Sequence, residues 1–246
     1  MGAGDCIVAL LDMLGARTAD EEVTDRLYRS MGFLRERMEF RAHDMVRQGQ
    51  GWIQHLPSPQ TLAFGDSLLF LWEVGQESKW LPVVGQLLSD VFLDALEKGV
   101  PLRGAISYGH AQYDNAVVLG PAISDAAEWY EEVNALAVVV TPRTGLLLDD
   151  IECQMGAKRL ARAFIRHGFR LKRQEGDRQL WTVSWPASPR EHAQGQSIGG
   201  QDIRRTVLSW LREFAMPYGT ECKYYEALRV FDEYEREFPH LQDHSG

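Results

Sequence analysis

The chain contains little cysteine, with only Cys6, Cys153 and Cys222 among 246 residues. The number is odd and the three lie far apart, so the sequence contains neither a disulfide framework nor a zinc knuckle. The seven histidines are also scattered and form no His-x-x-x-His or His-x-x-Glu-His pattern. We therefore expect a protein of a reducing compartment whose histidines lie at the surface or at helix caps.

The chain also lacks a long hydrophobic run. Cys6–Leu11 and Leu136–Val140 are among its longer apolar segments, whereas a membrane-spanning helix needs roughly 20 apolar residues. The residues after Met1 include no basic cluster of the kind that opens a secretory signal. The sequence therefore predicts a cytoplasmic protein that has no membrane as its partner.

Positive charge is scarce as well. Lys and Arg number 26 against 35 Asp and Glu, which gives a formal net charge of −9. This balance disfavours duplex nucleic acid and anionic membranes as partners. A small anion is not excluded, because a local pocket can be positive on an acidic protein. The chain has an ordinary globular composition, with 45% hydrophobic and 25% charged residues.

Hydrophobic periodicity predicts a β-α-β-β-α-β order in the first part of the chain. Cys6–Leu11 is a continuous apolar run typical of a strand buried on both faces, and an apolar stripe over 23–45 predicts a long helix. Two short apolar segments follow, separated only by Gly65-Asp66, and predict a β-hairpin with Asp66 at its tip, because glycine in first position suits a type II′ turn. The last elements are a helix over 84–95 and a strand over 102–108. The order predicts an α+β fold with a ferredoxin-like βαββαβ core.

The second half of the chain is expected to add units to this core. These are a short strand over 116–119, a helix from Pro121 to about Asn134, a strand over 136–140, and an added hairpin of strands 169–173 and 179–185. We divide the chain into a catalytic domain (1–186), a linker (187–201) and a C-terminal helical tail (202–246). Two apolar stripes in the tail predict a helical pair that packs on its own core or on a partner subunit.

Two carboxylates occupy informative places in this order. Asp12 follows the first buried strand, and the hairpin tip that carries Asp66 can lie beside the end of that strand. Two carboxylates there would repel each other unless a cation lies between them, and Mg²⁺ or Mn²⁺ shared with substrate phosphates suits oxygen ligands. The segment Met13, Leu14, Gly15 and Ala16 turns into the helix, where free N–H groups can bind phosphate. The plainer interpretation is that Asp66 is a turn residue and Asp12 a helix cap.

Three segments resemble the catalytic domain of class III nucleotide cyclases. Cys6-Ile-Val-Ala-Leu-Leu-Asp12-Met-Leu-Gly-Ala16 resembles their opening strand, and Thr61-Leu-Ala-Phe-Gly65-Asp66-Ser-Leu-Leu-Phe70 resembles the hairpin that carries their second metal-binding Asp. Arg103-Gly-Ala-Ile-Ser-Tyr-Gly109 with Val118-Leu-Gly120-Pro-Ala-Ile-Ser124-Asp-Ala-Ala-Glu128 resembles the later strand and helix. The resemblance covers residues 5 to about 185 in the same order.

The resemblance implies a specific reaction. Two Mg²⁺ or Mn²⁺ ions held by Asp12 and Asp66 would bind a nucleoside triphosphate and favour attack of the ribose 3′-hydroxyl on the α-phosphorus, with pyrophosphate leaving. It also implies a homodimer with a composite active site at the subunit interface.

Four positions depart from the purine cyclases. Their base-reading Lys falls at Leu62, and their second base-reading residue falls near Val117. The ribose-positioning Asn falls at Ser124 and the transition-state Arg at Glu128. This pattern is similar to the pyrimidine cyclases of bacterial Pycsar antiphage systems. That resemblance implies cyclic UMP or cyclic CMP, made from UTP or CTP, which activates a separate effector.

Several cations are candidates to replace the missing arginine. Arg103 stands on the strand before the nucleotide helix, and Lys172 and Arg173 stand on the added hairpin, where class III cyclases supply a phosphate-binding Lys. Solvated surface cations are an equally good interpretation of each. Two further functions stay open: a purine cyclase with relocated base contacts, and a catalytically silent cyclase-like domain that binds a nucleotide or dimerises.

Overall fold

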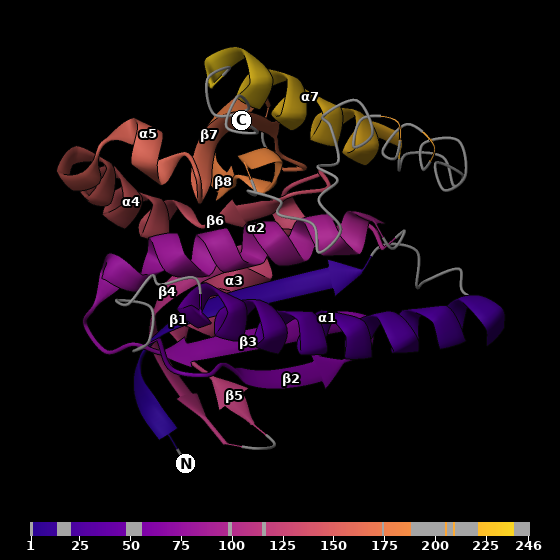
Figure 1. Cartoon of the computed structure of the whole chain (residues 1–246), viewed down its shortest axis with the longest axis vertical. Helices are drawn as coiled ribbons and strands as arrows, with labels where there is room; N and C mark the ends of the chain where they lie inside the picture. The colour runs from indigo at the N-terminus through magenta and orange to yellow at the C-terminus, as the bar shows by residue number, and fades with distance from the viewer. Residues whose placement is uncertain are drawn as a thin grey trace.

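The computed structural model describes residues 2–13, 21–47, 56–97, 100–114, 117–173, 175–187 and 221–238, with positions 205 and 209. These residues form one mixed β-sheet covered by helices on both faces (Figure 1). No helix among them is long and apolar enough to cross a membrane. The α+β class predicted from the sequence is confirmed.

The sheet is built around β1 (Gly2–Met13), which pairs antiparallel with β3 (Ser67–Glu73) on one side and with β4 (Leu102–Tyr113) on the other. β2 (Gln60–Phe64) lies outside β3, so the first four strands stand in the order β2-β3-β1-β4. With the helices between them, this is the ferredoxin-like βαββαβ arrangement expected from the sequence. β1 is buried from Cys6 onward because the sheet has helices on both faces.

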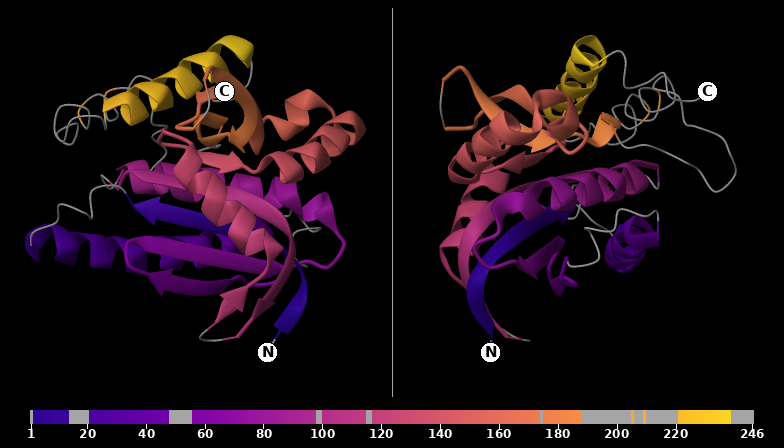
Figure 2. Two further views of the ribbon diagram at one scale, coloured as in Figure 1. Left: turned by 180° about the vertical axis from the view of Figure 1, so that it is seen from behind. Right: turned by 60° about the vertical axis from the view of Figure 1, so that its left-hand side comes forward.

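Helices α1 (Glu21–Arg47) and α2 (Leu81–Glu97) lie side by side on one face of this sheet, and α3 (Pro121–Glu132) crosses the other face (Figure 2). Leu34 and Met38 of the predicted α1 stripe are completely buried. The stripe of α1 is therefore a packing face, as amphipathic periodicity predicts.

The tight hairpin between β2 and β3 has the predicted turn. Gly65 has φ +59°, and no residue other than glycine has a positive φ in the described chain, so Asp66 does not. A type II′ turn needs a positive φ only at its first central residue, whereas type I′ needs it at both. Gly65 therefore allows the chain to reverse in two residues and fixes Asp66 at the tip.

The later strands extend the sheet on the β4 side. β5 (Val118–Leu119) pairs with the end of β4, and β6 (Val138–Val140) runs parallel to β4. The added hairpin consists of β7 (Phe164–Arg170) and β8 (Asp177–Val183), so its first strand begins and ends earlier than predicted. Between β6 and β7 lie α4 (Pro142–Met155) and α5 (Ala157–Leu160), to which the sequence analysis assigned no element. Two short 3₁₀ turns, η3 (Ser78–Trp80) and η4 (Trp185–Ala187), also belong to this part of the fold.

The C-terminal tail is represented by α7 (Glu221–Glu237), which corresponds to the second predicted tail helix. Its apolar stripe packs on the core of its own chain, where Phe231 stacks on Trp185 with ring centroids 5.9 Å apart. The predicted linker (187–201), apart from Ala187, and most of the first tail helix lie outside the described residues. The boundaries of the predicted domains stay a prediction.

Candidate active site

Asp12 and Asp66 meet at one end of β1. Asp12 pairs with Ser67 in the β1–β3 register, and the backbone N–H of Met13 donates to the carbonyl oxygen of Asp66 at 3.0 Å. The hairpin tip therefore lies against the end of the first strand, as the sequence analysis expected. Two residues separated by more than fifty positions are brought together because β3 runs antiparallel beside β1.

The carboxylate of Asp12 is buried and is held by two side chains. Its Oδ2 accepts a hydrogen bond from Arg103 Nε at 2.7 Å, and its Oδ1 accepts one from the Ser67 hydroxyl at 3.1 Å. The side chains of Asp12 and Arg103 are 7% and 11% exposed. Burial raises the pKa of Asp12, the Arg103 guanidinium opposes this rise, and the nearby Asp66 charge adds to it.

Arg103 faces Asp12 because β4 lies beside β1 at this point, with Asp12 and Arg103 directly opposite in the register. Gly104, the next residue, allows the two strands to approach. A Cβ there would stand 2.4 Å from the carbonyl oxygen of Leu10. A larger residue at 104 would therefore push β4 away from β1 and pull Arg103 from Asp12.

The donor set fits a divalent cation. Asp12 and Asp66 supply hard carboxylate oxygens, and an ionised carboxylate has about four lone-pair sites, of which the contacts of Asp12 use two. A cation between the two carboxylates would also relieve the repulsion that Asp66 exerts on Asp12. Among the described residues, no group of three or more His, Cys, Asp or Glu is placed to hold a metal ion. Any metal here would therefore need further ligands from substrate phosphates or water.

Tyr130 of α3 covers the Arg103 side of this site. The Arg103 Cζ lies 5.2 Å from the centre of the Tyr130 ring, within cation–π range. Burial raises the pKa of Tyr130, and the charges of Glu131 and Asp12 raise it further. The ring therefore stays neutral at physiological pH and holds the guanidinium beside Asp12.

The four positions that depart from the purine cyclases lie on three other elements. Leu62 is half-buried on the edge strand β2, and Val117 is 51% exposed in the turn before β5. Ser124 and Glu128 are both exposed and stand four residues apart on α3, so they share one helix face. Among the described residues, no hydrogen bond or ion pair joins any of these four side chains to Asp12 or Asp66.

Lys172 and Arg173, the two cationic residues of the added hairpin, make different contacts. The backbone N–H of Lys172 donates to the Glu132 carbonyl at 3.0 Å, and its side chain is exposed. Arg173 is committed to Glu132: its backbone N–H donates to Glu132 Oε1 at 2.7 Å and its Nε lies 3.3 Å from Oε2. Arg173 therefore anchors the hairpin loop to the end of α3.

The predicted phosphate-binding segment is described only at its first residue. Met13 is 1% exposed, and its backbone N–H is used by Asp66. Leu14, Gly15 and Ala16 lie outside the described residues. Met13 therefore contributes to the positioning of Asp66, and phosphate binding by the rest of the segment stays a prediction.

Lys223 of α7 lies near the carboxylate site, and the sequence analysis did not single it out. It is half-buried, and it lies within electrostatic range of Asp12, Arg103 and Lys172. It belongs to the predicted tail, and no motif marks it, so only the packing of α7 could reveal it.

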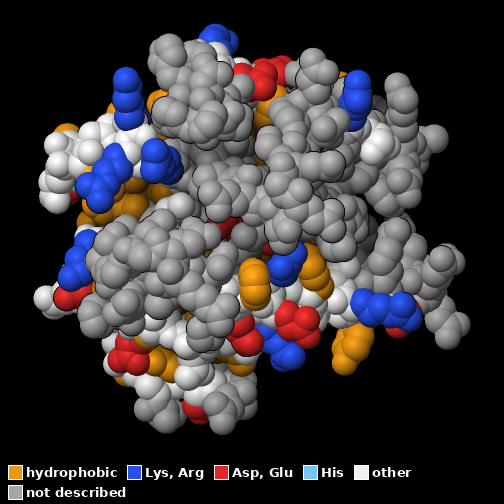
Figure 3. Space-filling model, viewed as in Figure 1, with side chains coloured by type: hydrophobic (Ala, Val, Ile, Leu, Met, Phe, Trp, Pro, Cys, Tyr) orange, Lys and Arg blue, Asp and Glu red, His pale blue; other side chains and the backbone are white. Residues whose placement is uncertain are grey.

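A concave region lies away from the carboxylate site. A cavity of about 630 Å³ is bounded by residues of η3, α2, α4 and α5, among them Trp80, Met155 and Arg159. Figure 3 shows Lys and Arg side chains gathered over the α4–α5 corner, with both signs of charge interspersed on the rest of the visible face. The described surface in this view therefore presents no extended basic face of the kind that binds duplex nucleic acid.

The comparisons with known proteins concern structure alone. No family model matches the sequence, and no curated protein does either. Solved structures of similar chain path include an adenylate/guanylate cyclase/hydrolase from Silicibacter pomeroyi, with a TM-score of 0.46, 16% identity, and coverage of 74% of this chain and 97% of that one. A bacterial light-regulated adenylyl cyclase has a TM-score of 0.42 and 17% identity over 84% of this chain and 100% of that one. The catalytic core of a rhodopsin-guanylyl cyclase with converted specificity, in complex with ATPαS, has a TM-score of 0.44 and 11% identity over 74% and 98%. Similarity this low carries no argument about function, which depends on the residues described above.

Proposed function

We propose that the protein is a metal-dependent pyrimidine nucleotide cyclase that converts UTP or CTP to the 3′,5′-cyclic monophosphate and pyrophosphate. The observation that carries the proposal is the meeting of Asp12 and Asp66 at the end of β1, with Arg103 bonded to Asp12. A buried carboxylate beside a second one, at the end of an interior strand, is the donor set that a phosphate-bound Mg²⁺ or Mn²⁺ prefers.

Four residues of this chain have separate roles in the proposed reaction. Asp12 and Asp66 would hold two ions, which when bound supply activation of the 3′-hydroxyl and stabilisation of the leaving pyrophosphate. Arg103 uses its Nε for Asp12, and its two terminal nitrogens have no other hydrogen-bond partner among the described residues, so they can donate to a phosphate oxygen. Tyr130 holds the guanidinium in that position. The chain therefore offers an oriented cation for the charge that develops during phosphoryl transfer.

The preference for a pyrimidine rests on apolar residues at the base-reading positions. Leu62 and Val117 have no donor or acceptor in their side chains, so they cannot form the hydrogen bonds that read a purine edge. The choice between UTP and CTP stays open, because neither side chain distinguishes an exocyclic amine from a carbonyl.

The proposed active site is completed in a homodimer. Ser124 and Glu128 are exposed on α3 in one chain, and Val117 is exposed just before β5, which pairs with the last residues of β4. Exposed positions that are predicted to contact nucleotide are expected in a composite site, where each subunit supplies a part. The cyclic product would be a second messenger for a separate effector in antiphage defence, and the enzyme would act in the cytoplasm.

Turnover with each of four nucleotides tests this function. Purified protein with Mn²⁺ receives ATP, GTP, CTP and UTP separately, and the products are resolved by mass. We expect a cyclic pyrimidine, and we expect D12N and D66N each to lower its formation at least about 100-fold, because each removes a metal ligand. Asp150→Asn, the same substitution at an exposed position of α4, is the matched control and should retain wild-type turnover.

The other outcomes separate the alternatives. A cyclic purine product would agree with the proposed mechanism and would overturn the proposed preference for a pyrimidine. Equal activity in wild type, D12N and D66N would overturn the metal site.

A second candidate is a catalytically silent nucleotide-binding or dimerisation domain. The ion pair between Arg103 and Asp12 favours it, because it gives the buried carboxylate a structural role without any metal. The absence of product from all four nucleotides, together with D66N leaving nucleotide binding unchanged, would support this candidate.

A further inference from the structure

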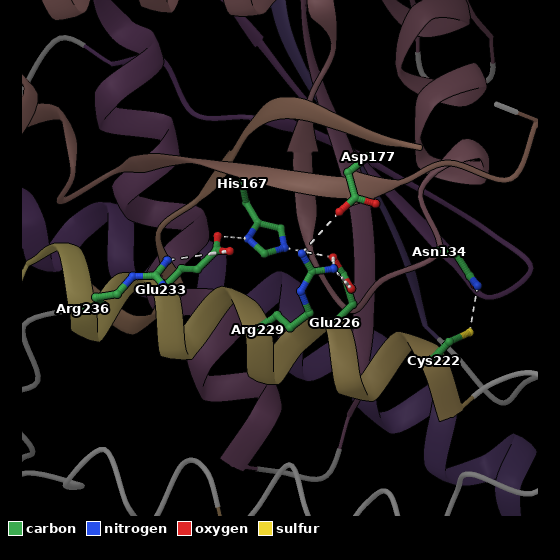
Figure 4. Close-up of polar contacts among 8 residues, drawn as sticks. All are labelled: Asn134, His167, Asp177, Cys222, Glu226, Arg229, Glu233 and Arg236. Carbon is green, nitrogen blue, oxygen red and sulfur yellow. Dashed lines mark hydrogen bonds and ion pairs between the residues drawn. The ribbon is translucent and has the colours of Figure 1, made fainter. Parts of the chain in front are cut away.

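Helix α7 is fixed on the core by a buried histidine. His167 of β7 is completely buried, and its ring lies between Glu226 and Glu233 of α7 (Figure 4). Its Nε2 lies 2.9 Å from Glu226 Oε1, and its Nδ1 is hydrogen-bonded to Glu233 Oε2. Both ring nitrogens therefore face a carboxylate of α7, which fixes the orientation of the imidazole. Arg229 extends the cluster from Glu226 to Asp177 of β8, and these contacts set the position of α7 along its axis.

The first turn of α7 is fixed at a second place. The backbone N–H of Leu136 donates to the carbonyl of Lys223 at 3.1 Å, and the Asn134 amide lies 2.8 Å from Cys222 Sγ (Figure 4). Leu136 leads directly into β6, which runs parallel to β4 with Val138 opposite Gly104. Lys223 therefore stands beside the strand that carries Arg103.

The loop that carries Lys172 reaches the same place from the other side. Leu171 forms an isolated β-bridge with Val133, and the Lys172 backbone is bonded to Glu132. Three elements distant in sequence thus converge near the start of β4: the β7–β8 loop, the segment before β6, and the start of α7. Backbone hydrogen bonds join the β7–β8 loop to the end of α3 and the segment before β6 to the start of α7. The proximity of these segments therefore does not depend on side-chain conformation.

Three cationic side chains, those of Lys223, Arg103 and Lys172, act on one another there, with Asp12 as the carboxylate bonded to Arg103. Burial lowers the pKa of Lys223, the charges of Arg103 and Lys172 lower it further, and Cys222 and Asp12 act in the opposite direction. Arg103 is at the same time bonded to Asp12. A half-buried ammonium among two other cations is unfavourable by itself, and an anion with several charges would stabilise all three.

We propose that Lys223 binds the polyphosphate chain of the nucleoside triphosphate, together with Arg103 and Lys172, so that the tail helix supplies a substrate-binding residue. The proposal rests on the proposed function for the identity of the substrate. A triphosphate suits the place because its oxygens can contact three cations that come from three elements.

Binding of inorganic tripolyphosphate tests the role of Lys223 separately from turnover. Calorimetric titration in the presence of Mg²⁺ compares wild type with Lys223→Met and Lys223→Gln. Lys158→Met is the matched control, because Lys158 is exposed on α5 and lies outside the site. We expect about 10- to 100-fold weaker binding in both Lys223 variants, which is the usual effect of losing a charge-assisted hydrogen bond. The control should bind like wild type.

Turnover of the preferred nucleotide gives the second readout. Lys223→Met is expected to lower kcat/KM by a similar factor, and Lys223→Arg to restore much of it, since an arginine also donates to phosphate. Thermal unfolding of each variant shows whether α7 is still docked. If Lys223→Met were unfolded, the comparison of Lys223→Gln and Lys223→Arg with wild type would show whether Lys223 binds the polyphosphate.

The two proposals fail in different ways. Tripolyphosphate binding that is equal in wild type and the folded Lys223 variants overturns the role of Lys223, whatever the turnover. Binding that depends on Lys223 without any cyclic product supports the polyphosphate site and overturns the cyclase reaction.

Discussion

At the scale of single residues, the pair formed by Asp12 and Arg103 decides the character of the site. Both side chains are almost completely buried, and each is the principal countercharge of the other. A buried ion pair contributes little net stability, but removal of one partner leaves an uncompensated charge inside the protein. The pair therefore links the stability of the sheet to the chemistry proposed at the end of β1.

Replacement of Arg103 by Met tests this link. We expect R103M to lower the free energy of unfolding by about 3–5 kcal/mol, because Asp12 then lies buried without its cation. Chemical denaturation of R103M and wild type measures the loss.

The double variant D12N/R103M is the control for that interpretation. It removes both charges, so it should recover a large part of the lost stability. If the double variant were as unstable as R103M, the loss would come from packing of the arginine stem and not from the unpaired carboxylate.

At the scale of elements, α7 combines two kinds of contact with the core. Its polar face holds His167, and its apolar face buries Tyr224, Phe231 and Tyr234. Burial raises the pKa of Tyr224 and of Tyr234 to about 12, from an ordinary value of 10.0. The neutral phenol is therefore favoured by folding. Its contribution is fully present below pH 10 and is lost as the pH rises through about 12.

An alkaline titration checks this expectation. The loss is about 2–3 kcal/mol for each buried tyrosine once the pH exceeds both pKa values. Helicity, followed from neutral to alkaline pH, should be lost in one cooperative step that coincides with the tyrosinate absorbance of the buried phenols. Y224F/Y234F should move the loss of helicity to higher pH.

Tyr225 provides the comparison on the same helix. Its side chain is 59% exposed, so Y225F should leave the alkaline transition where it is in wild type. A Y225F variant that moved the transition as far as Y224F/Y234F would mean that burial of the phenols does not determine it.

At the scale of the whole molecule, the tail belongs to the same hydrophobic core as the sheet. Six apolar or aromatic residues of α7 are buried, namely Tyr224, Ala227, Leu228, Val230, Phe231 and Tyr234. Removing α7 would expose Trp185 and its neighbours, which the helix covers. An exposed surface of this kind promotes aggregation.

Deletion of residues 188–246 is therefore expected to unfold or aggregate the protein. The lost burial is on the order of 5–10 kcal/mol, which is comparable to the total stability of an ordinary domain. Thermal unfolding and mass in solution measure the effect, and deletion of 239–246 alone, which leaves α7 whole, is the control. A truncated protein with wild-type unfolding temperature would show that α7 packs too weakly to stabilise the core.

The sequence by itself determined the α+β class, the βαββαβ order and the tight turn at Gly65, because periodicity and glycine placement are local signals. It also allowed Asp66 to lie beside Asp12, and the pairing of the hairpin with the central strand brings the two together. Helices α4 and α5 carried no comparably strong signal. Only the tertiary structure decided that Arg103 pairs with Asp12, that Arg173 is committed to Glu132, and that Lys223 of the tail reaches the site. Contacts of this kind depend on which elements pack together across long sequence separations, and no local pattern in the chain records that choice.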